Sequence, residues 1–127
     1  GELGRLLDVD SAEVGRARLR HARAAALRAH ALVVLKGDDT IVAAPSGRVA
    51  ISPGGAPALA TAGTGDVLAG VAGALLAKRL SPAHAVCAAV YAHLRAGRLA
   101  AAPHGPDGVI ASDVIAALPA ALAAGSG

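Results

Sequence analysis

The residues LATAGTGDVLAG (59–70) are the stretch that best indicates how this chain folds. Small residues lead directly to Asp66, and an apolar segment follows it. A turn of this kind entering a helix presents N–H groups that lack intrahelical partners, beside the positive end of the helix dipole. We therefore expect a main-chain cradle for phosphate oxygens, with the Thr64 hydroxyl as a further donor. The expected cradle, or anion hole, consists of Ala62, Gly63, Thr64 and Gly65.

Asp66 is the charged residue of this stretch, and two interpretations fit it. A carboxylate in the first helical turn is stabilised as an anion and can take a proton from an attacking hydroxyl. Alternatively, it only complements the dipole of its own helix, and the glycines only form a tight turn. The stretch is not a Walker A loop, because no Gly-Lys-Ser/Thr follows the glycines, and its glycine spacing differs from a dinucleotide-binding fingerprint.

The residues before this stretch predict an α/β arrangement. A helix is expected from Asp10 or Ser11 to about His30, followed by a continuous apolar run over 31–35 that is typical of a strand buried on both faces. Residues 40–44 and 48–51 predict two short strands joined by a turn, which would form an antiparallel hairpin at a sheet edge. A helix that leads into a buried strand is half of an α/β unit.

The residues after the glycine-rich turn predict three helices. The first, from Asp66 to about Leu80, is apolar on nearly all sides and is expected to be central and buried. The pair Ser81-Pro82, an N-cap followed by proline at the first helical position, predicts a second helix that ends near Ala102. Ser112 or Asp113 is expected to cap a last helix.

Composition limits the class of protein. The chain has 127 residues, which suits one modest domain, and 54% of them are hydrophobic. Tyr91 is the only aromatic residue and Met is absent, so the core must consist of Ala, Val, Leu and Ile. The sequence opens at Gly1 without a starting Met, and we therefore expect a fragment of a longer protein.

Several other classes of function are disfavoured. The net charge of +3 comes mostly from arginines near the start of the chain, but a nucleic-acid module would normally add aromatic stacking platforms or a reading motif. Cys87 is alone, which excludes an internal disulfide and favours a reducing cytoplasm. The five histidines lack the spacing of metal ligands, so no metal site made by protein side chains is expected. No apolar run approaches the roughly 20 residues of a membrane span.

Residues 59–70 resemble the anion-hole motif of ribokinase-like enzymes, in the form used by ADP/ATP-dependent NAD(P)H-hydrate dehydratases. The resemblance covers almost the whole chain but only about the C-terminal half of the family domain. It implies that residues 1–127 are the C-terminal portion of one ribokinase-like domain, an α/β three-layer sandwich. Ala56 and Ala58 depart from the family, which usually has Asn and Gly there. Further similar segments follow in the family's order: 1–3 (the tail of a His-Pro-Gly-Glu motif), 33–42, 47–49 and 108–113.

The resemblance also implies roles for individual residues. Asp66 would hold the hydrated nicotinamide and act as the catalytic base, and Gly65 would contact the phosphate end of the nucleotide. The remaining nucleotide contacts would come from Lys36, Gly37, Asp38, Asp39 and Thr40.

The implied reaction is the repair of a damaged cofactor. The S-epimer of NADHX or NADPHX would be dehydrated while ADP or ATP is converted to AMP or ADP plus phosphate, with Mg²⁺ bridging the nucleotide phosphates. The resemblance further implies a cytoplasmic homo-oligomer, a tetramer in the family, without nucleic-acid or membrane partners. Two alternatives stay open: a ribokinase-like kinase that acts on a vitamin precursor, and an inactive nucleotide-binding fragment.

Overall fold

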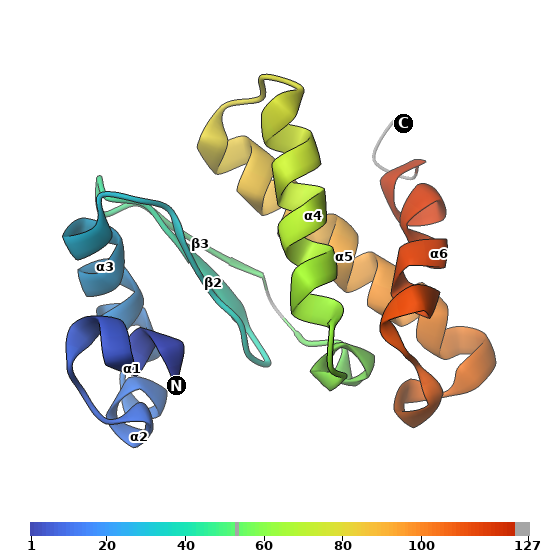
Figure 1. Cartoon of the computed structure of the whole chain (residues 1–127), viewed down its shortest axis with the longest axis horizontal. Helices are drawn as coiled ribbons and strands as arrows, with labels where there is room; N and C mark the ends of the chain where they lie inside the picture. The colour runs from blue at the N-terminus through green and yellow to red at the C-terminus, as the bar shows by residue number, and fades with distance from the viewer. Residues whose placement is uncertain (53, 124–127) are drawn as a thin grey trace. The chain divides into compact units, whose positions relative to one another are not determined.

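The computed structural model describes residues 1–52 and 54–123 and divides into two compact units (Figure 1). Unit 1 comprises Gly1–Pro53 and unit 2 comprises Gly54–Gly127. Each unit has its own hydrophobic cluster.

Unit 1 is a small antiparallel sheet with a helix packed on it. Ile41 of the central strand pairs with Leu35 on one side and Ile51 on the other. The helix α3 places Ala22 and Ala26 against this sheet, where small side chains allow close approach. Its elements in chain order are α1 (Glu2–Leu7), α2 (Ser11–Arg16), α3 (Arg18–Ala29), β1 (Val33–Leu35), β2 (Thr40–Ala43) and β3 (Val49–Ser52).

The predicted hairpin is confirmed, because β2 and β3 pair antiparallel around a turn in which Gly47 has φ of 87°. The Asp10 cap is also confirmed, since its carboxylate accepts a hydrogen bond of 2.8 Å from the Ala12 N–H. The single helix expected to reach His30 is wrong. The chain breaks at Ala17, whose φ of −140° and ψ of 54° separate α2 from α3.

The prediction of a strand buried on both faces is wrong as well. Every residue of β1 is only half-buried. The helix α3 packs against this part of the sheet, and the described residues of unit 1 supply no second covering layer. An apolar run shows which residues can be buried, but it does not show whether both faces are covered.

Unit 2 is a helical assembly in which α5 packs against both α4 and α6 (Figure 1). Its elements are η1 (Pro57–Ala60), α4 (Thr64–Ala77), α5 (Pro82–His104), η2 (Pro106–Gly108) and α6 (Ala111–Ala123). The Ser81 cap is confirmed, because its hydroxyl accepts from the His84 N–H. The last helix begins at Ala111, and Asp113 accepts a hydrogen bond from the Ile110 N–H, which satisfies a donor at the helix start.

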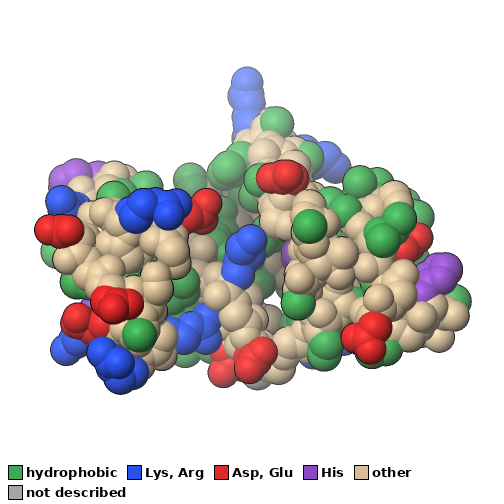
Figure 2. All heavy atoms as spheres, turned by 60° about the horizontal axis from the view of Figure 1, so that its bottom comes forward, with side chains coloured by type: hydrophobic (Ala, Val, Ile, Leu, Met, Phe, Trp, Pro, Cys, Tyr) green, Lys and Arg blue, Asp and Glu red, His purple; other side chains and the backbone are tan. Residues whose placement is uncertain are grey.

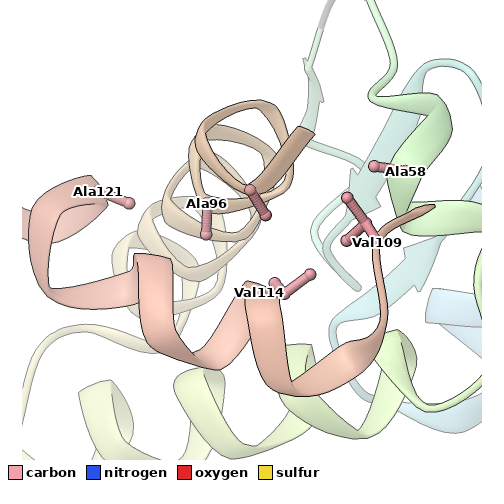
Figure 3. Close-up of a cluster of buried hydrophobic side chains, with 6 residues drawn as sticks. Ala58, Ala96, Val109, Val114 and Ala121 are labelled. Atoms are coloured by element: carbon pink, nitrogen blue, oxygen red, sulfur yellow. The ribbon is translucent and has the colours of Figure 1, made fainter. Parts of the chain in front are cut away.

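The core of unit 2 lies between α5, α6 and the two short 3-10 helices. Val109 and Val114 are fully buried and lie in the same cluster as Ala96 of α5 (Figure 3). Ala58 and Ala121 complete the cluster at its two ends. The core is therefore made of small aliphatic side chains, as the composition predicts.

The expectation that α4 is the central, buried helix is wrong. Only Thr64, Leu68 and Val71 of this helix are buried, whereas α5 has nine buried residues between Ala85 and Ala100. A helix that is apolar on all sides does not reveal which side packs, and α5 carries the continuous stripe of small residues that allows two neighbours to approach. Part of the apolar surface of α4 lines a groove, described below.

Candidate active site

The turn that enters α4 depends on Gly63. This residue caps the helix with φ of 86°, a left-handed conformation that side chains rarely adopt. A Cβ at this position would lie 3.3 Å from the Cβ of Ala111. The sequence therefore needs glycine here for two reasons, backbone conformation and space.

The turn leaves amide donors available to a ligand. The Thr64 N–H donates to the Thr61 carbonyl at 3.4 Å, and the Asp66 N–H donates to the Gly63 carbonyl at 3.2 Å. Within residues 1–52 and 54–123, no acceptor is found for the N–H groups of Ala62, Gly63 and Gly65. This is the arrangement expected of an anion cradle at a helix N-terminus.

The Thr64 side chain does not take the role expected of it. Its hydroxyl is buried, with the residue 4% exposed, and it lies 2.7 Å from the Leu59 carbonyl oxygen and 2.8 Å from that of Thr61. A threonine hydroxyl in a first helical turn readily satisfies nearby main-chain groups. The prediction of an additional hydroxyl donor in the cradle is therefore wrong, and the hydroxyl instead fixes the turn to η1.

Two further contacts hold the turn in place, and sequence reasoning missed both. The Thr61 hydroxyl donates to the Val109 carbonyl at 3.1 Å, which ties the turn to the segment 108–113. The ring of His93, on α5, contacts the Thr64 carbonyl, with Nε2 2.8 Å from the oxygen. The only signal of the second contact is that His93 shares the buried face of α5 with Ala89 and Ala96.

Asp66 is exposed in the first turn of α4, at one end of a mostly apolar groove. No hydrogen-bond or ion-pair partner for its carboxylate occurs among the residues that the structure describes. The groove has a volume of about 630 Å³, and Gly63 stands beside Asp66 in its wall. Its other walls include Gly70 and Leu75 from α4, the C-cap Lys78, and Ile115, Leu118 and Leu122 from α6. The exposed carboxylate thus lies beside amides that have no acceptor among the described residues.

The predicted nucleotide loop belongs to unit 1. Residues 36–39 are exposed between β1 and β2, and Thr40 begins β2. Arg18 of α3 donates through Nη2 to the Leu35 carbonyl at 3.2 Å and to the Asp39 carbonyl at 2.7 Å. A Cβ on Gly37 would come within 2.4 Å of that nitrogen, so glycine lets the guanidinium span the loop. Sequence reasoning treated Arg18 only as one of the arginines near the start of the chain and missed this contact.

A family model described as NAD(P)H-hydrate dehydratase matches residues 1–120. The chain belongs to the NAD(P)H-hydrate dehydratase family. A bifunctional NAD(P)H-hydrate repair enzyme from Gloeobacter violaceus is 54% identical over 103 residues, which are 81% of this chain and 20% of that protein. The ADP-dependent (S)-NAD(P)H-hydrate dehydratase of Bacillus subtilis is 34% identical over 119 residues, which are 94% of this chain and 43% of that protein.

A solved structure agrees with the family membership. The ADP/ATP-dependent NAD(P)H-hydrate dehydratase from Bacillus subtilis, co-crystallised with ATP and Mg²⁺, has a TM-score of 0.92 and 33% sequence identity. The match covers 98% of this chain and 45% of that one. The predicted ribokinase-like α/β fold is confirmed, and the chain spans less than half the length of these dehydratase relatives.

The described residues contain no group of three or more His, Cys, Asp or Glu side chains placed to hold a metal ion. None of their helices is long and apolar enough to cross a membrane.

Proposed function

We propose that this chain supplies the phosphate cradle and the catalytic base of an ADP- or ATP-dependent (S)-NAD(P)H-hydrate dehydratase. The observation that carries the proposal is the exposed Asp66 carboxylate beside the amides of Ala62, Gly63 and Gly65, which have no acceptor among the described residues. The family membership and the name of the Bacillus subtilis relative support the choice of substrate.

In this proposal Asp66 accepts the proton of the ring hydroxyl of the hydrate. The hydroxyl oxygen attacks the terminal phosphorus of the nucleotide, and the bond from that phosphorus to AMP or ADP breaks. The amides of the cradle stabilise the negative charge that develops on the transferred group. The C–O bond of the resulting phosphate ester then breaks, and inorganic phosphate leaves with its electron pair, assisted by the ring nitrogen; loss of a ring proton restores NADH or NADPH.

In unit 1, the loop of residues 36–40 is proposed to contact the adenine nucleotide. Lys36 offers an ammonium group there, and Arg18 keeps the loop in a fixed conformation. Mg²⁺ would be held mainly by the nucleotide phosphates, as is usual for this ion. When bound, it would neutralise phosphate charge.

Homo-oligomerisation and a cytoplasmic location complete the proposal. Hydrophobic side chains reach the molecular surface in Figure 2. In unit 2 the exposed large hydrophobic residues include Leu76, Ile115 and Leu122. Such exposed apolar residues often mark a surface that another chain or segment covers. Light scattering of the full-length protein gives the oligomeric state.

Replacing Asp66 by Asn tests the base directly. In the full-length protein that carries these residues, we expect kcat to fall roughly 10²- to 10⁴-fold, the usual contribution of a general base, while ADP binding is kept. The assay offers NADH hydrate with ADP or ATP and follows the NADH absorbance. Asp107→Asn is the matched control, because Asp107 is also exposed and lies near the start of a helix in the same unit.

Normal turnover by Asp66→Asn contradicts the assignment of the base. A parallel panel with hydroxymethylpyrimidine and hydroxyethylthiazole tests the substrate class. Consumption of a vitamin precursor but not of the hydrate identifies a kinase instead.

A further inference from the structure

His93 is a buried titratable residue that the proposed reaction does not use. It lies on the inward face of α5, is 6% exposed, and reaches the first turn of α4. Its Nε2 atom is 2.8 Å from the Thr64 carbonyl oxygen. A carbonyl oxygen can only accept, so Nε2 carries the proton and donates this hydrogen bond.

The carbonyl that accepts this bond belongs to the same peptide group as the Gly65 N–H. A peptide group is planar and rigid, so a bond that fixes the oxygen also fixes the direction of the N–H. Hydrogen bonds in series polarise one another, and donation to the oxygen makes the N–H a stronger donor. Gly65 supplies one of the cradle amides for which no acceptor is found among the described residues.

The contact is more than a way to satisfy a buried carbonyl. In an α-helix the carbonyl of residue 64 is in position to accept from the amide four residues later, so the His93 donor is an additional one. The other side-chain contacts of the turn involve different carbonyl groups. Thr61 donates to the Val109 carbonyl, and the Thr64 hydroxyl faces the carbonyls of Leu59 and Thr61.

We propose that His93 is a positioning residue for phosphoryl transfer. By holding and polarising the peptide between Thr64 and Gly65, it directs the Gly65 N–H at an oxygen of the terminal phosphate of ADP or ATP. This inference rests on the proposed function, because it requires that the cradle binds a nucleotide phosphate.

Two substitutions of similar chemistry separate positioning from packing. His93→Gln places its side-chain N–H₂ the same number of bonds from Cα as Nε2, so it can still donate to the Thr64 carbonyl. His93→Asn is shorter by one methylene group and does not reach. His104→Gln is the control, because His104 lies at the exposed C-terminal end of the same helix. Thermal unfolding by circular dichroism verifies that all variants are folded.

Two measurements are made on each variant of the full-length protein. The first is the ¹⁵N–¹H resonance of Gly65 without ligand, which reports the polarisation of the peptide. The second is turnover with ADP and the hydrate, together with ADP affinity from calorimetry. We expect His93→Asn to shift the Gly65 resonance and to lower kcat at least roughly tenfold, as for a weakened oxyanion donor. His93→Gln restores both toward the wild type, and the KM for the hydrate changes little.

Each outcome decides one of the two proposals. If His93→Asn is folded and turns over like the wild type and the Gln variant, the positioning role is wrong and the proposed function stands. The role is also wrong if the Gln and Asn variants lose activity equally. If the wild-type protein binds no ADP, the phosphate cradle itself is wrong, and the role of His93 falls with it.

Discussion

Gly63 is the residue on which the direction of the cradle amides depends. Its left-handed φ of 86° turns the chain so that the amides of Ala62, Gly63 and Gly65 are left without acceptors among the described residues. Side chains at such φ values cost roughly 1–2 kcal/mol. The motif was recognisable from its residue types, because the requirement for a small residue is local.

Replacing Gly63 by Ala is therefore expected to weaken both stability and nucleotide binding. The strain and the close approach to Ala111 lower the free energy of unfolding by roughly 1–3 kcal/mol, and the reoriented amides lower ADP affinity. Urea unfolding and calorimetric titration with ADP measure the two effects. Gly47→Ala is the control, because Gly47 has φ of 87° but no atom within 4 Å of its added Cβ. ADP affinity that survives in Gly63→Ala would show that the turn does not bind phosphate.

Arg18 is the second residue whose role needed the structure. Its two hydrogen bonds join the end of β1 to the residue before β2, across the predicted nucleotide loop. Its partners lie 17 and 21 residues away in the sequence, and no local pattern indicates such a contact.

Arg18→Ala is expected to weaken ADP binding several-fold, because the loop of residues 36–39 loses the donor that fixes its conformation. The loss of stability should be roughly 1–3 kcal/mol, since each of the two hydrogen bonds typically contributes about 0.5–1.5 kcal/mol. Calorimetric titration with ADP checks the affinity. Arg23→Ala, an exposed arginine on the same helix, is the control and should bind ADP normally. If Arg18→Ala and Arg23→Ala bind ADP with equal affinity, Arg18 has no role in nucleotide binding.

At the scale of elements, the predictions that held were those with a local cause. Asp10 and Ser81 begin helices because a side-chain oxygen accepts from an amide two or three residues ahead, and the sequence contains both partners. The hairpin followed from two short runs and a turn. The break at Ala17 was not predictable, because alanine is the best helix former and only tertiary packing can override it.

The packing of helices was predicted less well, because it depends on partners distant in the sequence. The sequence of α4 is apolar on nearly all sides, but α5 has more buried residues than α4. The reason is that α5 has close neighbours on two sides. The contact from His93 to Thr64 joins residues 29 positions apart. From the sequence, His93 was only a histidine without a metal-ligand spacing.

Two helical glycines should respond to alanine with opposite signs. A Cβ on Gly97 of α5 would lie 2.6 Å from Leu59 Cγ, so Gly97→Ala is expected to destabilise the protein by roughly 1–3 kcal/mol. Gly73 of α4 has no atom within 4 Å of its added Cβ, and Gly73→Ala should stabilise the helix by roughly 0.5–1 kcal/mol. Urea unfolding measures both. A destabilised Gly73→Ala would show that this face of α4 is covered.

At the scale of the whole molecule, composition correctly predicted the kind of core. The buried hydrophobic residues are mostly Ala and Val, and Val109 and Val114 are the largest that are fully buried. Such side chains bury little area each, so the units depend on close helix approach. The chain spans less than half the length of its dehydratase relatives, and its composition could not show which apolar surfaces, such as the α4 groove, are exposed within these residues.

The central claim is that a nucleotide phosphate meets the Gly65 amide beside the Asp66 carboxylate. The most direct measurement is a crystal structure of the full-length Asp66→Asn variant with ADP and the hydrate. We predict that an oxygen of the terminal phosphate lies about 2.9 Å from the Gly65 nitrogen, with the ring hydroxyl between that phosphate and residue 66. A terminal phosphate bound away from residues 62–65, or a hydrate whose hydroxyl faces away from residue 66, would contradict the account.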